Sequence, residues 1–230
     1  MAVFLSGSVI EPVIGKDNFS DNDWATIIRA CQMNRVPKTW AVGDNKTMTI
    51  NGVEYQIDII GKNHDVYSDG TGTAPLTFQM RECYATKYTM HSTATNTNGW
   101  TNCTMRTTHI PAILALMPTE VKSALREVNK LTNSGGTSST VVTTADKLFL
   151  LSEIEVFGVV SQSKAGEGTR YDYYTNGYSA VKKIGTSNSA YWLRSPKNAN
   201  SVQYCAISVN GVASVLDANG TSGVSLAFCF

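Results

Sequence analysis

Residues 190–230, AYWLRSPKNANSVQYCAISVNGVASVLDANGTSGVSLAFCF, carry the strongest pattern in the chain. Two sets of side chains alternate there with the period of two that is typical of a strand with one buried face: Cys205, Ile207 and Val209 against Tyr204, Ala206 and Ser208. Asn210 and Gly211 both tolerate positive φ and predict a type I′ hairpin turn. Residues 212–216 would return antiparallel, and the apolar residues 223–230 predict a buried final strand.

Between its apolar positions this stretch is poor in charge and rich in small polar residues, with an occasional aromatic residue. Antibody loops have a similar composition. We therefore predict a ligand-binding surface made of Asn198, Asn200, Gln203, Tyr204, Ala206, Ser208, Val212, Ser214, Leu216 and Asn219. Composition alone is equally compatible with a solvated hairpin that binds nothing.

Several motifs, taken in their order along the chain, resemble a known domain family. They are residues 47–61, GWTNCTMR at 99–106, DKLFLLSE at 146–153, YWLRSP at 191–196 and GVSLAF at 223–228. From about Trp24 onward, the chain is similar to a domain family of unknown function common in phages and prophages of gut Firmicutes. That family is related in fold to formylglycine-generating enzymes and to phage tropism determinants. The resemblance implies an α+β, C-type-lectin-like domain with small twisted antiparallel sheets, two or three flanking helices and long loops.

The resemblance also implies a function in host recognition. In phage tropism determinants, diversity-generating retroelements rewrite the C-terminal segment by mutating adenines, and Asn codons are the usual targets. Residues 198–222 consist largely of the amino acids that this process produces, interrupted by Cys205, Gly211 and Gly223. The implied partners are a host cell-surface protein or glycan, other virion tail proteins, and further copies of the chain, with a trimer as one option. The alternatives are a virion structural or decoration protein without a receptor and, less favoured, a vestigial formylglycine-generating-type enzyme.

Composition sets limits on the class of protein. The chain has 230 residues, of which 42% are hydrophobic, enough to build one large domain or two small ones. Nineteen basic residues balance eighteen acidic ones without any basic block, which argues against nucleic-acid binding. Only 16% of residues are charged, a low share that suits extracellular or virion proteins. No signal peptide or membrane-inserting segment is visible, so we expect synthesis in the bacterial cytoplasm and a place in the virion.

We divide the chain into an N-terminal arm, residues 1–18, and one domain, residues 19–230, whose ligand-facing segment is 190–230. The arm either completes the sheet of the domain or serves attachment and oligomerisation. Helices are predicted at 20–35, capped by Ser20, and at 110–131, where Val128 and Leu131 continue the apolar stripe. A hairpin is predicted across Asn51 and Gly52, a loop at 133–144, and a buried strand at 148–151 followed by a short helix.

The sequence offers little for catalysis. Five cysteines show no metal spacing, and we favour buried free thiols over a Cys205–Cys229 bridge. The stretch 64–70 resembles a calcium loop but has Tyr67 where an oxygen ligand is needed, which favours a solvated turn. Cys103 near Arg106 lacks a base, and neither Glu-Pro-Asn nor Gln-Pro-Asp sugar-binding elements are present. We therefore predict no catalytic residues, no metal site, no cofactor and no enzymatic activity.

Overall fold

The computed structural model describes residues 13–230. Most of the predicted arm, residues 1–12, lies outside this range. The described chain combines 20% helix and 32% strand in small antiparallel sheets, which confirms the α+β class. Among the described residues, no helix has both the length and the apolar character needed to cross a membrane.

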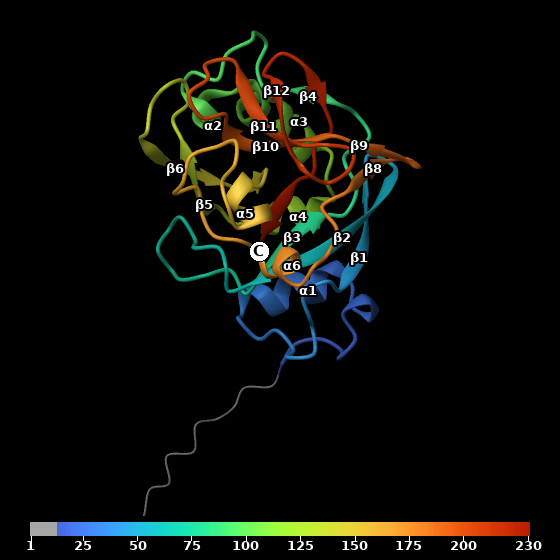
Figure 1. The fold of residues 1–230 in the computed structure, drawn as a ribbon. Helices are drawn as coiled ribbons and strands as arrows, with labels where there is room; N and C mark the ends of the chain where they lie inside the picture. The colour runs from blue at the N-terminus through green and yellow to red at the C-terminus, as the bar shows by residue number, and fades with distance from the viewer. Residues whose placement is uncertain (1–12) are drawn as a thin grey trace, which may run out of the picture.

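The main sheet brings strands from the first third of the chain together with the last strand. Its strand order is β1-β2-β3-β14-β7 and all its pairs are antiparallel. The strands are β1 (Asn45–Ile50), β2 (Val53–Lys62), β3 (Leu76–Met80), β14 (Ala227–Cys229) and β7 (Leu148–Phe149). The final strand therefore lies inside the sheet, where the ring of Phe228 stacks on that of Phe78 with centroids 5.5 Å apart. The C-terminus accordingly lies in the middle of the molecule (Figure 1).

The hairpin between β1 and β2 forms as predicted. Asn51 and Gly52 have φ values of 50° and 77°, and Ile50 pairs directly with Val53. Positive φ at both central residues defines the type I′ turn, whose twist matches that of the flanking strands.

A second sheet has the order β10-β11-β12, with strands β10 (Tyr191–Pro196), β11 (Gln203–Ile207) and β12 (Ala213–Asp217). Its β11–β12 hairpin exists, but the predicted type I′ turn is wrong. Gly211 has a φ of 78°, whereas Asn210 is not among the residues with positive φ. The N–H of Gly211 donates to the Ser208 carbonyl, and the N–H of Ser208 donates to the Val212 carbonyl, each at 2.9 Å. The loop therefore has three residues and places glycine at a bulge.

The remaining strands form three two-stranded antiparallel sheets. They are β5 (Val128–Asn133) with β6 (Val141–Asp146), β8 (Lys182–Ile184) with β9 (Ser187–Ser189), and β13 (Thr221–Ser222) with β4 (Tyr88–Thr89). The predicted helix across 110–131 is therefore wrong in its last part, because Val128 and Leu131 lie in β5. Pairing with β6 outweighs the helical spacing of these two residues. Within the predicted 133–144 loop, residues from Val141 onward belong to β6.

The helices are short; η1 and α1 precede the first strand, and the others lie between strands in the sequence. They are η1 (Phe19–Asp21), α1 (Trp24–Gln32), α2 (Gly99–Asn102), η2 (Met105–His109), α3 (Ile110–Ala115), α4 (Thr119–Ala124), α5 (Glu153–Phe157) and α6 (Asp172–Thr175). Helix α1 is capped by Asp23, whose side chain accepts the Thr26 N–H at 2.8 Å, and not by Ser20 as predicted. Ser152 and Glu155 form a capping box at α5.

Candidate functional site

The predicted ligand surface lies on the β11–β12 hairpin, but two of its residues are buried. Tyr204 is 0% exposed and Ala206 is 1% exposed, so their predicted place on a solvent-facing surface is wrong. The physical reason is that β11 is the middle strand of its sheet and both of its faces are covered. The hydroxyl of Tyr204 donates to the Gly99 carbonyl of α2 at 2.8 Å. Val209, predicted to be buried, is instead exposed in the turn.

Tyr204→Phe should lower the free energy of unfolding by about 1–2 kcal/mol, because it leaves the buried Gly99 carbonyl without this donor. Urea unfolding of the wild type and the variant measures the difference. Tyr178→Phe is the matched control, since its hydroxyl donates to the Val42 carbonyl at an exposed position and its loss should be nearly neutral. Equal stability of Tyr204→Phe and wild type would show that the Gly99 contact is dispensable.

The other eight predicted residues retain solvent exposure. Asn198, Val212 and Asn219 are exposed, and five are partly exposed: Asn200, Gln203, Ser208, Ser214 and Leu216. Strand β12 is an edge of its sheet, so the side chain of Ser214 reaches solvent while its backbone remains paired with Ala206. The structure thus brings most of the predicted surface together around one edge strand.

Some of these exposed residues already serve the fold. The carboxamide oxygen of Asn200 accepts the N–H groups of Val202 and Gln203, each at 2.8 Å. The side chain of Gln203 donates to Asp217 at 2.9 Å and accepts from Lys197 at 3.2 Å. No hydrogen bond within residues 13–230 involves the side chain of Asn198, Val212, Ser214 or Asn219, and these are the residues best placed to contact a ligand.

The loop that leads into β11 is held by a residue that sequence reasoning missed. Asn96 is 0% exposed, and its amide nitrogen donates to the carbonyls of Asn200 and Gln203, each at 2.7 Å. Its carboxamide oxygen accepts the Gly136 N–H at 2.8 Å. One buried amide therefore connects three segments that are far apart in sequence, a relation that no local motif signals.

A network of buried charges connects β10, the first strand of the β10-β11-β12 sheet, to other parts of the fold. Arg194 of β10 makes two hydrogen bonds to Glu155 of α5, at 2.5 and 2.8 Å. Lys130 of β5 pairs with Glu155 and with Asp65, each at 2.7 Å. The hydroxyl of Tyr171 also donates to Asp65, at 2.8 Å. The two cations and two carboxylates neutralise each other, and all four side chains are buried.

The electrostatics of Glu155 follow from these partners. Burial alone would raise the pKa of Glu155, but Arg194 and Lys130 outweigh it and hold this pKa at about 2. Asp65 belongs to the stretch predicted as a solvated turn, and for this residue that prediction is wrong, since it is 3% exposed. Because each of the four charged groups has a partner of opposite charge, the network is better suited to holding segments together than to proton transfer.

A cavity of about 370 Å³ opens above this network. Asp65, Lys130 and Glu155 line it, and their charged groups already pair with one another. Its rim includes His64, whose ring stacks on that of Tyr171 with centroids 3.9 Å apart. The carboxylates and the ammonium group that line this cavity therefore serve the network rather than a ligand.

Residues 76–230, more than half of the chain, match the model of the domain of unknown function DUF6273. The chain belongs to this family. No curated protein and no solved structure matches the chain. The DUF6273 match begins at β3 and contains the β11–β12 hairpin, Glu155 and Arg194, whereas β1, β2 and Asp65 precede it. Because β2 pairs with β3, the main sheet of this chain extends beyond the segment matched to DUF6273.

The cysteines of the DUF6273 segment and the one before it are free and buried, as predicted. The alternative Cys205–Cys229 bridge is not formed, and these two residues lie in different sheets. Burial raises the pKa of the Cys31, Cys83 and Cys103 thiols to about 12, which disfavours the nucleophilic thiolate. Within residues 13–230, no three His, Cys, Asp or Glu side chains are grouped to hold a metal ion.

Cys103 and Arg106, which the sequence places close together, both make contacts that hold the fold. Arg106 donates to Asp146 at 2.6 Å, and the indole of Trp100 donates to the same carboxylate at 2.9 Å. Cys103 itself bonds the Trp100 carbonyl. Glu153, two residues before Glu155, accepts backbone N–H groups from residues 161, 162 and 163 and so anchors the following loop.

Proposed function

We propose that this chain is a phage or prophage host-recognition protein with a C-type-lectin-like fold. It presents β12 and the adjoining loops to a host cell-surface protein or glycan, while other parts of the chain contact virion tail proteins or further copies. The observation that carries this proposal is an edge strand, β12, whose side chains reach solvent and are uncharged from Ala213 to Leu216, next to a middle strand that is buried from Tyr204 to Ile207. The resemblance to phage tropism determinants supplies the functional class.

This arrangement suits a surface whose side chains can be exchanged. Exposed side chains away from special contacts change stability by about 0.5 kcal/mol or less when they are replaced. Ser214, Val212, Asn198 and Asn219 meet that condition, whereas Tyr204 does not. We therefore expect retroelement diversification of residues 198–222, where it occurs, to fall on the first four positions and to spare Tyr204.

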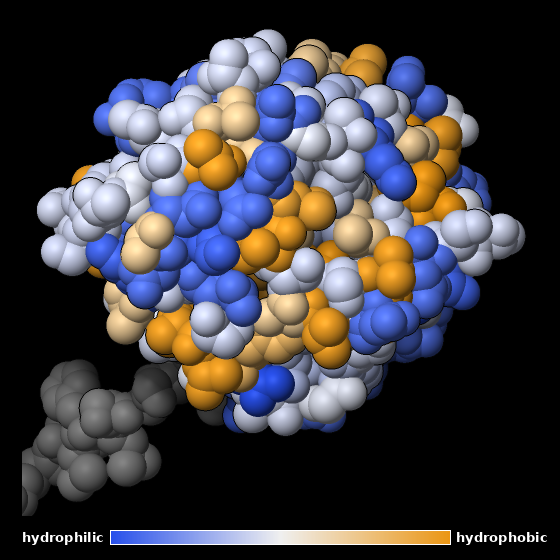
Figure 2. All heavy atoms as spheres, turned by 45° about the horizontal axis from the view of Figure 1, so that its top comes forward, coloured by the Kyte–Doolittle hydropathy of each residue, from blue (hydrophilic) through white to orange (hydrophobic). Residues whose placement is uncertain are grey.

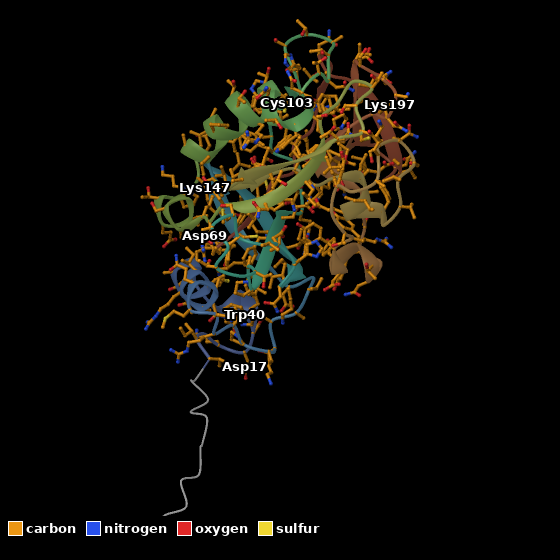
Figure 3. All side chains as sticks on the ribbon, turned by 90° about the vertical axis from the view of Figure 1, so that its left-hand side faces the viewer. Asp17, Trp40, Asp69, Cys103, Lys147 and Lys197 are labelled. Atoms are coloured by element: carbon orange, nitrogen blue, oxygen red, sulfur yellow. The ribbon has the colours of Figure 1, made fainter. Side chains whose placement is uncertain are left out.

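The position of this surface in the molecule also supports the proposal. Figure 1 places β11 and β12 at the opposite end from α1, near which the described chain begins. Figure 3 shows the same separation, with Lys197 at the upper end and Asp17 and Trp40 at the lower end. Figure 2 turns the upper end toward the viewer and shows hydrophobic residues in small groups among hydrophilic ones. Attachment at the lower end would leave the upper end free to contact a cell.

Ser214→Arg tests the proposal, because a long cation in the centre of β12 should obstruct a ligand without disturbing the core. We expect labelled protein to lose most of its adsorption to gut Firmicutes cells, with the free energy of unfolding changed by about 0.5 kcal/mol or less. Ser68→Arg, at an exposed position after β2, is the matched control. Adsorption unchanged by Ser214→Arg, or no adsorption by the wild type to any strain of a host panel, would contradict the proposal.

A further inference from the structure

Lys182 of β8 is a buried cation that no carboxylate neutralises directly. Its side chain is 4% exposed, and its ammonium donates to the Met80 carbonyl at 2.6 Å and to the Arg81 carbonyl at 3.3 Å. No ion pair of the described residues includes it. Buried charges are normally paired, because the loss of hydration is costly. Lys182 therefore occupies an electrostatic position that an anion would improve.

The contrast with Lys130 shows that the chain can supply counter-charges where the fold needs them. Lys130 is equally buried but has two carboxylates, Asp65 and Glu155, each at 2.7 Å. Burial lowers the pKa of Lys182 to about 8, so the side chain is still mostly protonated at neutral pH. Of these two buried lysines, Lys182 is therefore the one whose charge is not paired with a carboxylate of the described residues.

This lysine lines a cavity of about 310 Å³, which is within the size range of small-molecule sites. Arg81 and Lys183 add two further cations to its wall, and Tyr173 and Glu82 also line it. Arg81 donates through Nε and Nη2 to Asp58, which leaves Nη1 without a partner among the described residues. The planar guanidinium can offer these N–H groups to an oxyanion.

The negative groups near the cavity are fewer and already engaged. Asp58 accepts from Arg81 and from the Tyr173 hydroxyl, the latter at 3.0 Å. Glu82 accepts the Gln56 N–H through Oε2 at 3.0 Å. The residues in and beside the cavity therefore carry three positive charges and two negative ones, which leaves a local excess of positive charge.

We propose that this cavity binds a phosphate group, carried by a small molecule or by a polymer, with Lys182, Arg81 and Lys183 as the binding residues. Three cationic groups match the three terminal oxygens of a phosphate monoester better than the two oxygens of a carboxylate. The cavity adjoins the β11–β12 turn, because Gly211 packs so closely on Val181 that an added Cβ would lie 2.9 Å from a Val181 methyl group. The proposal does not depend on host recognition and stands or falls separately from it.

Titration calorimetry at neutral pH tests this site with glucose 1-phosphate, inorganic phosphate, acetate and glucose as probes. We expect both phosphates to bind the wild type, acetate to bind more weakly and glucose not to bind. Lys182→Met should lower the affinity for glucose 1-phosphate by about tenfold or more, the effect of removing a charged hydrogen-bond partner. Lys147→Met, at an exposed position, is the matched control and should bind like wild type.

A second measurement covers the case in which Lys182→Met does not fold. Acetic anhydride should modify Lys182 in the wild type more slowly when glucose 1-phosphate is present, while modification of Lys147 stays constant. No phosphate binding by the wild type, equal binding by a folded Lys182→Met, or no protection of Lys182 would each overturn the proposal. Phosphate binding without any preference over acetate would overturn the assignment to phosphate.

Discussion

Arg194→Met should lower the free energy of unfolding by about 3–5 kcal/mol, because it leaves a buried carboxylate without its main partner. Glu155 would keep only Lys130, which it shares with Asp65. The carbonyls of Leu131, Leu150 and Glu167 would also lose the donors that the guanidinium provides. Urea unfolding followed by circular dichroism measures the change. In the extreme case, the variant would already be unfolded at ambient temperature without urea.

Two further variants separate the loss of pairing from the loss of bulk. Arg29→Met replaces an exposed arginine of α1 by the same residue and should change stability by about 0.5 kcal/mol or less. Adding Glu155→Gln to Arg194→Met removes the uncompensated negative charge and should restore part of the lost stability, because residues in one network do not act additively. If Arg194→Met were as stable as Arg29→Met, the network would not be a determinant of the fold.

Features governed by local chemistry could be predicted from the sequence. The turn at Asn51 and Gly52 needs only two residues that tolerate positive φ, and the structure has both. The capping box of α5 depends on Ser152 and Glu155, three residues apart. In α1, the apolar residues Trp24, Ile27, Ile28 and Cys31 have the i, i+3, i+4, i+7 spacing of one helix face, and all four are buried. In each case the decisive contacts lie within a few residues of sequence.

The burial of Tyr204 shows where this reasoning ends. A period of two predicts one buried face, but it cannot tell that β11 has a strand on each side and cover on both faces. The available signal was the composition of the strand itself: Tyr204, Cys205, Ala206 and Ile207 are all apolar or aromatic. Such a run is also typical of a strand buried on both faces, and this alternative would have removed Tyr204 and Ala206 from the predicted surface.

The charge network and Lys182 could not be found from sequence patterns. Asp65, Lys130, Glu155 and Arg194 come from four separate segments, and each alone resembles a surface residue. Their pairing requires the main sheet, the β5–β6 hairpin and β10 to be assembled first. Only burial in the assembled fold distinguishes Lys182 from its exposed neighbour Lys183.

The buried acid Glu167 makes stability depend on pH in the opposite sense to Glu155. One carboxyl oxygen of Glu167 accepts the Asn133 N–H at 2.8 Å, while the other is buried and makes no hydrogen bond that meets normal geometry within residues 13–230. Burial raises the pKa of Glu167 from 4.5 to about 7. Below pH 4.5 the folded and unfolded states both carry the proton. Between pH 4.5 and 7 only the folded state keeps it, so the stability falls as the pH rises.

Glu167→Gln should remove this fall, because the amide is neutral at every pH and still offers an oxygen to the Asn133 N–H. We expect the variant to be about 2–3 kcal/mol more stable than wild type at pH 8 and nearly equal to it at pH 4.5. Urea unfolding at intervals between these two values measures the difference. Glu155, with its pKa of about 2, makes stability depend on pH mainly below this window. It is present in both proteins, so it does not alter the difference between them. Glu120→Gln, at an exposed position of α4, is the control and should follow the wild-type curve throughout. A constant difference between Glu167→Gln and wild type across the window would show that folding does not raise the pKa of Glu167, and would contradict this prediction.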